Sequence, residues 1–426
     1  MKKKLSSRFW AALTIFSLVG QVAWVVENMY FNVFIYKMFH ASAADISAMV
    51  TASAVTATLT TIFMGALSDK IGKRKFFICS GYILWGISIF SFVLLREDFI
   101  SKTFALAGSA AATGVSLTII LDCLMTFFGS TANDAAFNAW LTDSVTADKR
   151  GAAEGINAMM PLVSILVVFG GFMFFDLDKA SSWSLIYTII GIVVTAVGIL
   201  GFFLIGEPKI QRAEGSYFGG IVHGFLPKTI LTNKKLYVSL LAFILFNISI
   251  QIFMPYLIIY YEVSLGMTDY VLIMAPAIIV ASVVTALWGK VYDKRGYGFS
   301  GIVALISLLI GYAVLYLTRT TLPVFMGSLL MMSGYLCGMA VFGAYIRDKI
   351  SAGMAGRFQG VRICSQVLIP GIVGPMIGKK ILENAETIIG NDGTASFVPN
   401  ANIFLAAAIA AIFVLPLLFK TKEPAR

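Results

Sequence analysis

The sequence is poor in charged residues. Of its 426 residues, 13% are charged and 58% are hydrophobic. A soluble protein of this size could not present so much apolar surface to water. The scarcity of charge therefore excludes a soluble protein and predicts an all-α polytopic membrane protein.

Histidine and cysteine are also scarce. The two histidines, His40 and His223, fall in or near predicted loops, and no nucleophile–base spacing or nucleotide-binding motif accompanies them. We therefore expect no enzyme, no ATP-driven pump and no cofactor. The cysteines lie in apolar stretches without disulfide or metal-ligand spacing, which indicates packing roles and no metal site. They are Cys79, Cys123, Cys337 and Cys364.

The formal net charge of +10 does not indicate a nucleic-acid partner, because the basic residues are spread over alternating loops and form no patch. Instead they orient the chain. With both termini on the cytoplasmic side, the inner segments hold 24 Lys and Arg residues and the outer loops hold 7. The positive-inside rule therefore predicts a multi-pass protein of the plasma (inner) membrane with both termini cytoplasmic.

Long hydrophobic runs are what the sequence has in abundance. A membrane-spanning helix needs about 20 mostly apolar residues. Twelve predicted spans lie at about 9–37, 44–67, 76–96, 116–142, 151–175, 183–206, 236–260, 270–290, 298–318, 322–345, 356–378 and 399–420. They predict an N-terminal six-helix bundle (1–206), a cytoplasmic linker (207–235) and a C-terminal six-helix bundle (236–426), with 97–115 as an outer loop.

A short glycine-rich turn occurs twice. The pattern G-xxx-D-xx-G comprises Gly65, Asp69 and Gly72 between the second and third spans, and it returns 224 residues later. Two copies at corresponding places indicate a duplicated chain whose halves run the same way through the membrane. The residues that we expect to control gating are Gly65, Asp69, Gly72, Arg74, Gly289, Asp293, Gly296, Arg150 and Arg357.

The dipole of the second span disfavours a negative charge at its C-terminal end, so Asp69 should have a partner. Arg74, another cation or the N-terminus of a different helix would serve. When the inner side is closed, we expect Asp69 to meet the start of the eleventh span near Arg357. By the duplication, Asp293 should meet the start of the fifth span near Arg150.

The first copy, GALSDKIGKRK, resembles the loop 2–3 signature of the major facilitator superfamily, and the second copy resembles its loop 8–9 counterpart. The segments Trp24–Tyr30 and Asp122–Asp143 resemble the glycoside permease branch of sucrose and melibiose transporters. The resemblance implies secondary transport by alternating access, with spans 1, 4, 7 and 10 lining a central cavity.

Several polar residues lie within the predicted spans, where the apolar bilayer makes them energetically unfavourable. A charge within a span costs on the order of 3 kcal/mol by insertion scales. At 100° per residue, the polar residues of spans 1 and 4 each gather on one face. The residues that we expect to contact substrate or proton are Glu27, Asn28, Trp24, Asp122, Asn133, Asp134, Asn138, Gln251 and Arg362.

Carboxylates, amides and aromatic rings suit sugar hydroxyls and the apolar face of a sugar. The sequence thus predicts proton-coupled uptake of a di- or oligosaccharide by a monomer in the lipid bilayer. Glu27 is the expected proton-binding group, because the duplicated position carries Gln251, and Asp134 is expected to pair with Arg362. A drug or metabolite exporter, a sodium-coupled glycoside symporter and a non-transporting receptor or scramblase remain alternatives.

Overall fold

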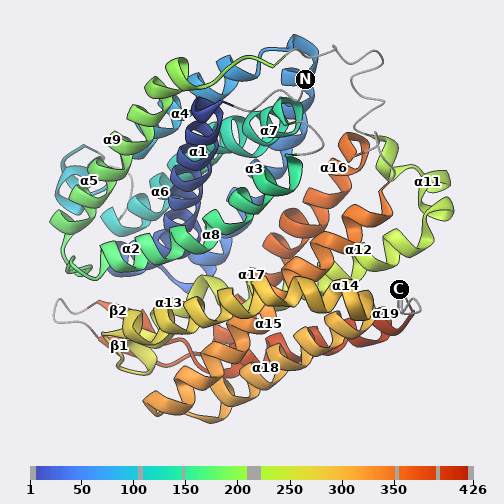
Figure 1. Cartoon of the computed structure of the whole chain (residues 1–426). Coiled ribbons are helices and arrows are strands. Elements are labelled where there is room, and N and C mark those ends of the chain that lie inside the picture. The colour runs from blue at the N-terminus through green and yellow to red at the C-terminus, as the bar shows by residue number, and fades with distance from the viewer. Residues whose placement is uncertain are drawn as a thin grey trace. The chain divides into compact units, whose positions relative to one another are not determined.

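The computed structural model describes residues 6–103, 109–145, 149–208, 222–350, 355–389 and 394–420. They form two compact units, shown in Figure 1. Unit 1 comprises Met1–Ala41 and Val55–Tyr217, and unit 2 comprises Ser42–Ala54 and Phe218–Arg426.

Unit 1 consists of helices throughout the part that the structure describes. Its helices, including α3 that begins in unit 2, are α1 (Ser7–Val25), η1 (Val26–Tyr30), α2 (Phe31–Phe39), α3 (Ala43–Ile71), α4 (Arg74–Ser91), η2 (Phe92–Leu94), α5 (Glu97–Thr103), α6 (Ala110–Gly129), η3 (Ser130–Phe137), α7 (Asn138–Ser144), α8 (Arg150–Phe172) and α9 (Ala180–Leu204). Helix α4 packs against α9, α6 and η3, while α1 packs against α8 and α9.

Unit 2 adds a short hairpin to its helices. Its elements are η4 (His223–Phe225), α11 (Pro227–Thr232), α12 (Lys234–Phe253), η5 (Met254–Tyr256), α13 (Leu257–Ile259), η6 (Tyr260–Ser264), α14 (Tyr270–Leu317), α15 (Thr321–Lys349), α16 (Ala355–Ile363), η7 (Cys364–Leu368), α17 (Ile369–Leu382), β1 (Thr387–Ile389), β2 (Ala395–Phe397), α18 (Asn402–Ile412) and α19 (Val414–Lys420). Helix α14 packs against α15, and α12 packs against α17 and α18.

The described residues contain eleven helices that are long and apolar enough to cross a membrane. One of them, α14, has 48 residues and includes two of the predicted spans. The break between these spans is at Gly296, whose φ of 74° and ψ of 179° are not helical. The predicted architecture of twelve spans in two six-helix bundles is therefore confirmed.

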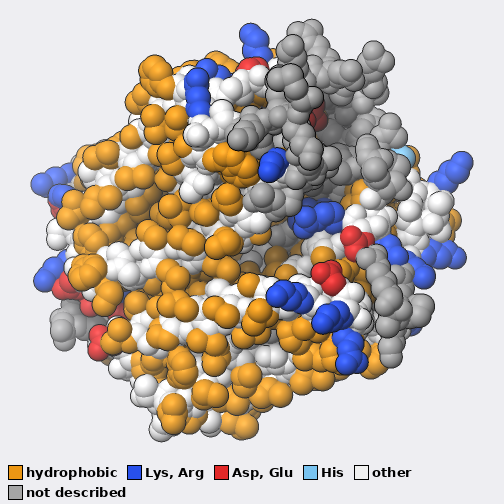
Figure 2. Space-filling model, viewed as in Figure 1, with side chains coloured by type: hydrophobic (Ala, Val, Ile, Leu, Met, Phe, Trp, Pro, Cys, Tyr) orange, Lys and Arg blue, Asp and Glu red, His pale blue; other side chains and the backbone are white. Residues whose placement is uncertain are grey.

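The outward faces of these helices are apolar, as a bilayer requires. Large hydrophobic side chains cover much of the face seen in Figure 2, whereas Lys and Arg gather near helix ends. Phe174 is 82% exposed and Leu317 is 74% exposed. Soluble proteins rarely leave contiguous apolar surface of this extent in water, so the chain is a polytopic membrane protein.

Two predicted loops contain regular structure. The segment 97–115 was expected to be an outer loop, but it contains α5, and α6 already begins at Ala110, where Ser109 caps the helix by accepting from the Ala112 amide. The alanines there lack the strong apolar signal of a span, but alanine is the best helix former. The segment between α17 and α18 contains the antiparallel pair β1–β2.

Close helix packing in unit 2 depends on the glycines of α17. A Cβ at Gly374 would lie 2.4 Å from the Cβ of Gln251, and a Cβ at Gly378 would lie 2.5 Å from the carbonyl oxygen of Ile252. Both neighbours belong to α12, so no larger residue fits without moving backbone.

The backbone at Gly296 gives a direct test of the break in α14. Only glycine adopts its φ and ψ readily, so Gly296→Ala should destabilise the protein by about 1–3 kcal/mol. The measurement is the melting temperature of the purified full chain in detergent. The control is Gly343→Ala in α15, where no atom lies within 4 Å of the added Cβ and no destabilisation is expected. Equal melting temperatures for the two variants would contradict the account of the break.

Candidate functional site

A carboxyl group lies in the interior of unit 1. Glu27 belongs to η1, a π-helical turn that follows α1, and only 6% of the residue is exposed. Its Oε1 accepts a 2.9 Å hydrogen bond from Oγ1 of Thr126, a fully buried residue of α6. The predicted polar faces of spans 1 and 4 therefore meet at this hydrogen bond.

A second carboxyl group, that of Asp122, lies on α6 one helical turn from Thr126. Asp122 precedes Thr126 by four residues, so both lie on one face of α6. Asp122 is 2% exposed, and its carboxyl interacts electrostatically with Glu27 and with the buried hydroxyl of Tyr187. Its Oδ1 has no hydrogen-bond partner among the described residues. We call Glu27, Asp122, Thr126 and Tyr187 the acidic cluster.

Basic residues are missing from the segments that form the acidic cluster. The sequence has no Lys or Arg between Arg8 and Lys37, or between Lys102 and Lys149. The segment that carries Tyr187 has none between Lys179 and the end of α9 at Leu204. Two neighbouring carboxylates in an apolar interior repel each other and lose hydration. The cluster is therefore suited to hold one proton, or a small hard cation, between its two carboxyls.

Two indoles pack against each other between α1 and α4. The rings of Trp24 and Trp85 are 5.0 Å apart between centroids, at an angle of 46°. Gly129 makes room for them, because a Cβ there would be 2.7 Å from Cε2 of Trp85 and 3.0 Å from Cη2 of Trp24. The Nε1 atoms of both indoles are buried and have no hydrogen-bond partner in the described part of the chain.

Asn133 and Asp134 lie in η3 and have partners within unit 1. The Asn133 amide donates to the Tyr82 hydroxyl (2.7 Å), which donates to the Phe16 carbonyl (2.8 Å). Half-buried Asp134 accepts a 3.0 Å hydrogen bond from Ser130. These bonds join the helices of the unit, whereas the expected substrate roles of both residues stay predictions. A pair between Asp134 and Arg362 would join the two units and also stays a prediction.

Two predicted contact residues lie on the exposed surface of unit 1. Asn28 donates to the Trp24 carbonyl at 2.8 Å, and Asn138 donates to the Asp134 carbonyl at 3.2 Å. The expected polar face of span 1 is thus divided, with Glu27 inside and Asn28 outside. One reason is that the π-helical turns η1 and η3 depart from the α-helical rotation on which that expectation depended.

The predicted turn after α3 closes on Arg74. This residue is 4% exposed, and its guanidinium donates to Asp143 Oδ2 (3.0 Å), to Ser68 Oγ (2.6 Å) and to Asp69. Gly72 has a φ of 71°, as the turn prediction required. Arg74 is thus the partner of Asp69 in this structure. A Cβ at Gly65 would lie 3.8 Å from Ala135, so Gly65 shows no unusually close approach.

The second copy of the motif makes different side-chain contacts. The position equivalent to Arg74 is Gly298. Asp293 is exposed, with no ion-pair partner among the described residues, and Tyr292 donates instead to Asp348 at 3.0 Å. Tyr297 stacks on Tyr345, with ring centroids 3.8 Å apart.

The remaining predicted residues are in unit 2 or have undescribed side chains. Gln251 is half-buried in α12, and Arg362 is half-buried in α16. Arg150 opens α8 and Arg357 lies in α16, but the side chains of both are outside the described set, so the expected contacts with Asp69 and Asp293 stay predictions.

Comparison with known proteins identifies the family. The sequence model of the Major Facilitator Superfamily matches residues 12–375. The chain belongs to the Major Facilitator Superfamily. No curated protein sequence matches this facilitator.

Several solved structures share the facilitator fold. A bacterial homolog of the human lysosomal transporter Spinster, inward-facing and unoccupied, has a TM-score of 0.72 at 16% identity, covering 98% of both chains. The nucleoside transporter NupG has a TM-score of 0.71 at 13% identity, covering 97% of this chain and 99% of its own. The xylose transporter XylE from E. coli has a TM-score of 0.70 at 12% identity, covering 98% of this chain and 100% of its own.

The superfamily resemblance is thus confirmed, and the family consists of membrane transporters of small molecules. Sequence reasoning missed Tyr187, which interacts with the Asp122 carboxyl, and Trp85, which packs against Trp24. Each lies in a strongly apolar run and belongs to no polar pattern. It also missed the ion pair of Asp143 with Arg74, although an acidic residue at the inner end of a span pointed to a basic partner.

The buried guanidinium of this facilitator can be tested by its removal. Arg74→Gln should lower the free energy of unfolding by about 2 kcal/mol, less than for a fully buried pair because both carboxylates are partly exposed. The measurement is thermal melting in detergent. Arg96→Gln, which breaks the exposed pair with Asp98, is the control and should leave the melting temperature unchanged. An unchanged melting temperature for Arg74→Gln would show that the cluster does not stabilise the turn.

Proposed function

We propose that this facilitator is a proton-coupled secondary transporter that takes up a sugar, a di- or oligosaccharide, by alternating access. The acidic cluster is the observation that supports the proposal most directly. Two neighbouring carboxyls buried in an apolar interior are costly when both are ionised. Binding and release of one proton would remove and restore that cost, and the proton gradient could thereby drive a cycle.

The sugar assignment depends on the kind of side chain available in unit 1. The half-buried indole of Trp24 supplies an aromatic ring, and Asn28 and Asn138 present amides at the exposed surface. Rings and amides are the groups that recognise the apolar face and the hydroxyls of a sugar. The similarity to XylE, a xylose transporter, agrees with a sugar substrate, and the similarity to NupG, a nucleoside transporter, widens the class to nucleosides, which also contain a sugar.

The glycoside permease branch, the plasma (inner) membrane and cytoplasmic termini belong to the same proposal. They are supported by the residues of spans 1 and 4 and by the excess of Lys and Arg in alternate loops. The chief alternative is sodium coupling, favoured by the hard oxygen ligands of Glu27, Asp122 and Thr126. Export of a drug or metabolite is the other alternative.

Uptake by the reconstituted full chain separates these functions. Proteoliposomes are loaded with labelled glycosides or nucleosides from a panel, under a pH gradient or a sodium gradient. We expect accumulation of a glycoside with the pH gradient alone, and its loss when a proton ionophore is added. Accumulation that needs sodium and withstands the ionophore would contradict proton coupling. Transport of apolar drugs without any glycoside uptake would contradict the sugar assignment.

Glu27 is the expected coupling group. Glu27→Gln keeps the shape of the side chain but cannot ionise, so it should abolish accumulation against a gradient while energy-independent exchange of sugar continues. Both are measured in the same proteoliposomes, as net uptake and as counterflow. Asp134→Asn is the comparison, because Asp134 lies outside the acidic cluster and should retain coupling. If Glu27→Gln still accumulates its sugar, then Asp122 or Asp134 carries the proton instead.

A further inference from the structure

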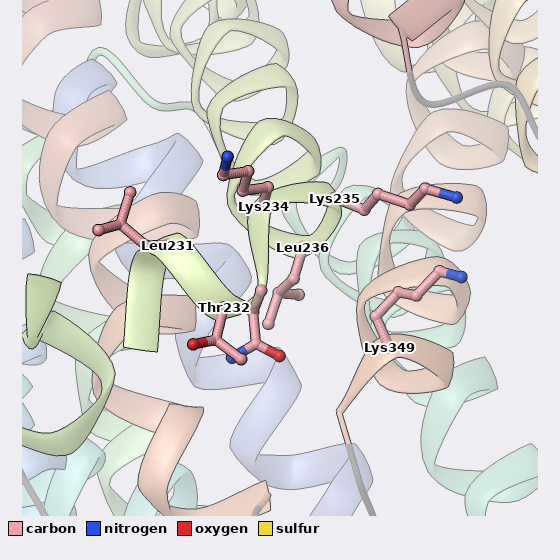
Figure 3. A pocket seen from close by; sticks show the side chains of 7 residues that line it. Leu231, Thr232, Lys234, Lys235, Leu236 and Lys349 are labelled. Carbon is pink, nitrogen blue, oxygen red and sulfur yellow. The ribbon is translucent and has the colours of Figure 1, made fainter. Parts of the chain in front are cut away.

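A basic pocket lies in unit 2, at the junction of α11 and α12 and the end of α15. It is a surface cavity of about 310 Å³. Figure 3 shows its side chains, which come from the α11–α12 junction and from the end of α15. The lining residues are Leu231, Thr232, Asn233, Lys234, Lys235, Leu236 and Lys349. We call this set the basic pocket.

Positive charge dominates the basic pocket. Lys235 and Lys349 extend in the same direction from neighbouring helices in Figure 3, and Lys234 precedes Lys235 at the start of α12. The N-terminus of this 20-residue helix adds partial positive charge, and Asn233 gives it no side-chain cap. The lining includes no acidic residue. An anionic group would therefore complement the pocket.

The position of Lys349 is fixed by aromatic rings. Its ammonium lies 5.1 Å from the ring centroid of Tyr345, and Tyr345 is stacked on Tyr297. A cation held over an aromatic face loses less freedom on binding a ligand than a freely moving side chain. The pocket is thus partly arranged in advance for an anion.

Apolar side chains lie next to these cations. On η4 and α11 and between them, Leu231 is 66% exposed, and Phe225, Leu226 and Ile230 are between 38% and 44% exposed. The spanning segments of α12 and α15 begin at Lys234 and end at Lys349. Apolar surface beside lysines at the ends of spanning helices is the arrangement that binds the interface of a membrane.

We propose that the basic pocket binds the headgroup phosphate of an anionic phospholipid. The phosphate lies among Lys234, Lys235 and Lys349, and the acyl chains extend over the exposed apolar side chains of α11. In this orientation the phosphate complements the charge of the lysines, and the acyl chains shield the exposed side chain of Leu231 from water. A soluble phosphate compound would contact the lysines alone and would leave the apolar side chains exposed to water.

The test uses the full chain purified in detergent and titrated with phosphatidylglycerol or with phosphatidylcholine of the same acyl chains. Native mass spectrometry gives the apparent affinity for the first bound lipid. The wild type should prefer phosphatidylglycerol. The triple variant Lys234→Gln, Lys235→Gln, Lys349→Gln should lose about fivefold in affinity per lysine, or roughly 100-fold in total. Replacing all three lysines with arginine should retain binding.

The control removes equal charge elsewhere, through Lys179→Gln, Lys379→Gln and Lys380→Gln. These exposed lysines do not line the basic pocket, so the preference for phosphatidylglycerol should persist. Unchanged lipid affinity in the basic-pocket variant, or an equal loss in the control, would overturn the proposal. Displacement of the bound lipid by inorganic phosphate alone would also overturn it, because the site would then recognise a free anion.

Discussion

The burial of two neighbouring carboxyl groups is the constraint on which the rest of unit 1 depends. Ionising both Glu27 and Asp122 in an apolar interior is costly, because the two charges repel each other and lose their hydration. Thr126 donates a hydrogen bond to Glu27, and the buried hydroxyl of Tyr187 interacts electrostatically with Asp122. A protein with only structural needs would be more stable with apolar residues there. The cost is therefore consistent with a role in which protonation changes during a cycle.

The two halves of the chain share a motif but differ in the interactions that surround it. In unit 1 a buried guanidinium, Arg74, joins Asp69 and Asp143. In unit 2 the corresponding region depends on stacked tyrosines and on a hydrogen bond from Tyr292 to Asp348. The pair of Glu27 and Gln251 follows the same division. The motif thus occurs in both units, whereas a buried guanidinium joins two carboxylates only in the described part of unit 1.

The number of spans and the turn at Gly72 followed from the sequence, because each depends on a local property: the length of apolar runs and the spacing of glycines around a charged turn. The site was harder to predict. Periodicity placed Glu27 and Asn28 on one face, whereas the structure separates them by burial. Trp85 and Tyr187 could not be found, since an aromatic residue in an apolar run looks like packing until its neighbours are known. Pairing across helices is decided by tertiary contacts that no single helix encodes.

The π-helical turns have a mechanical consequence. Glu27 lies in η1 and Asp134 lies in η3. Arg362 lies at the end of α16, two residues before η7 begins at Cys364. A π-turn widens the helix and interrupts its regular hydrogen-bond ladder. Each of these spans therefore consists of two regular helical segments joined by a more flexible π-turn, and the charged residue lies in that turn or next to it. Such a span can bend in the middle of the membrane while its ends stay anchored at the two surfaces.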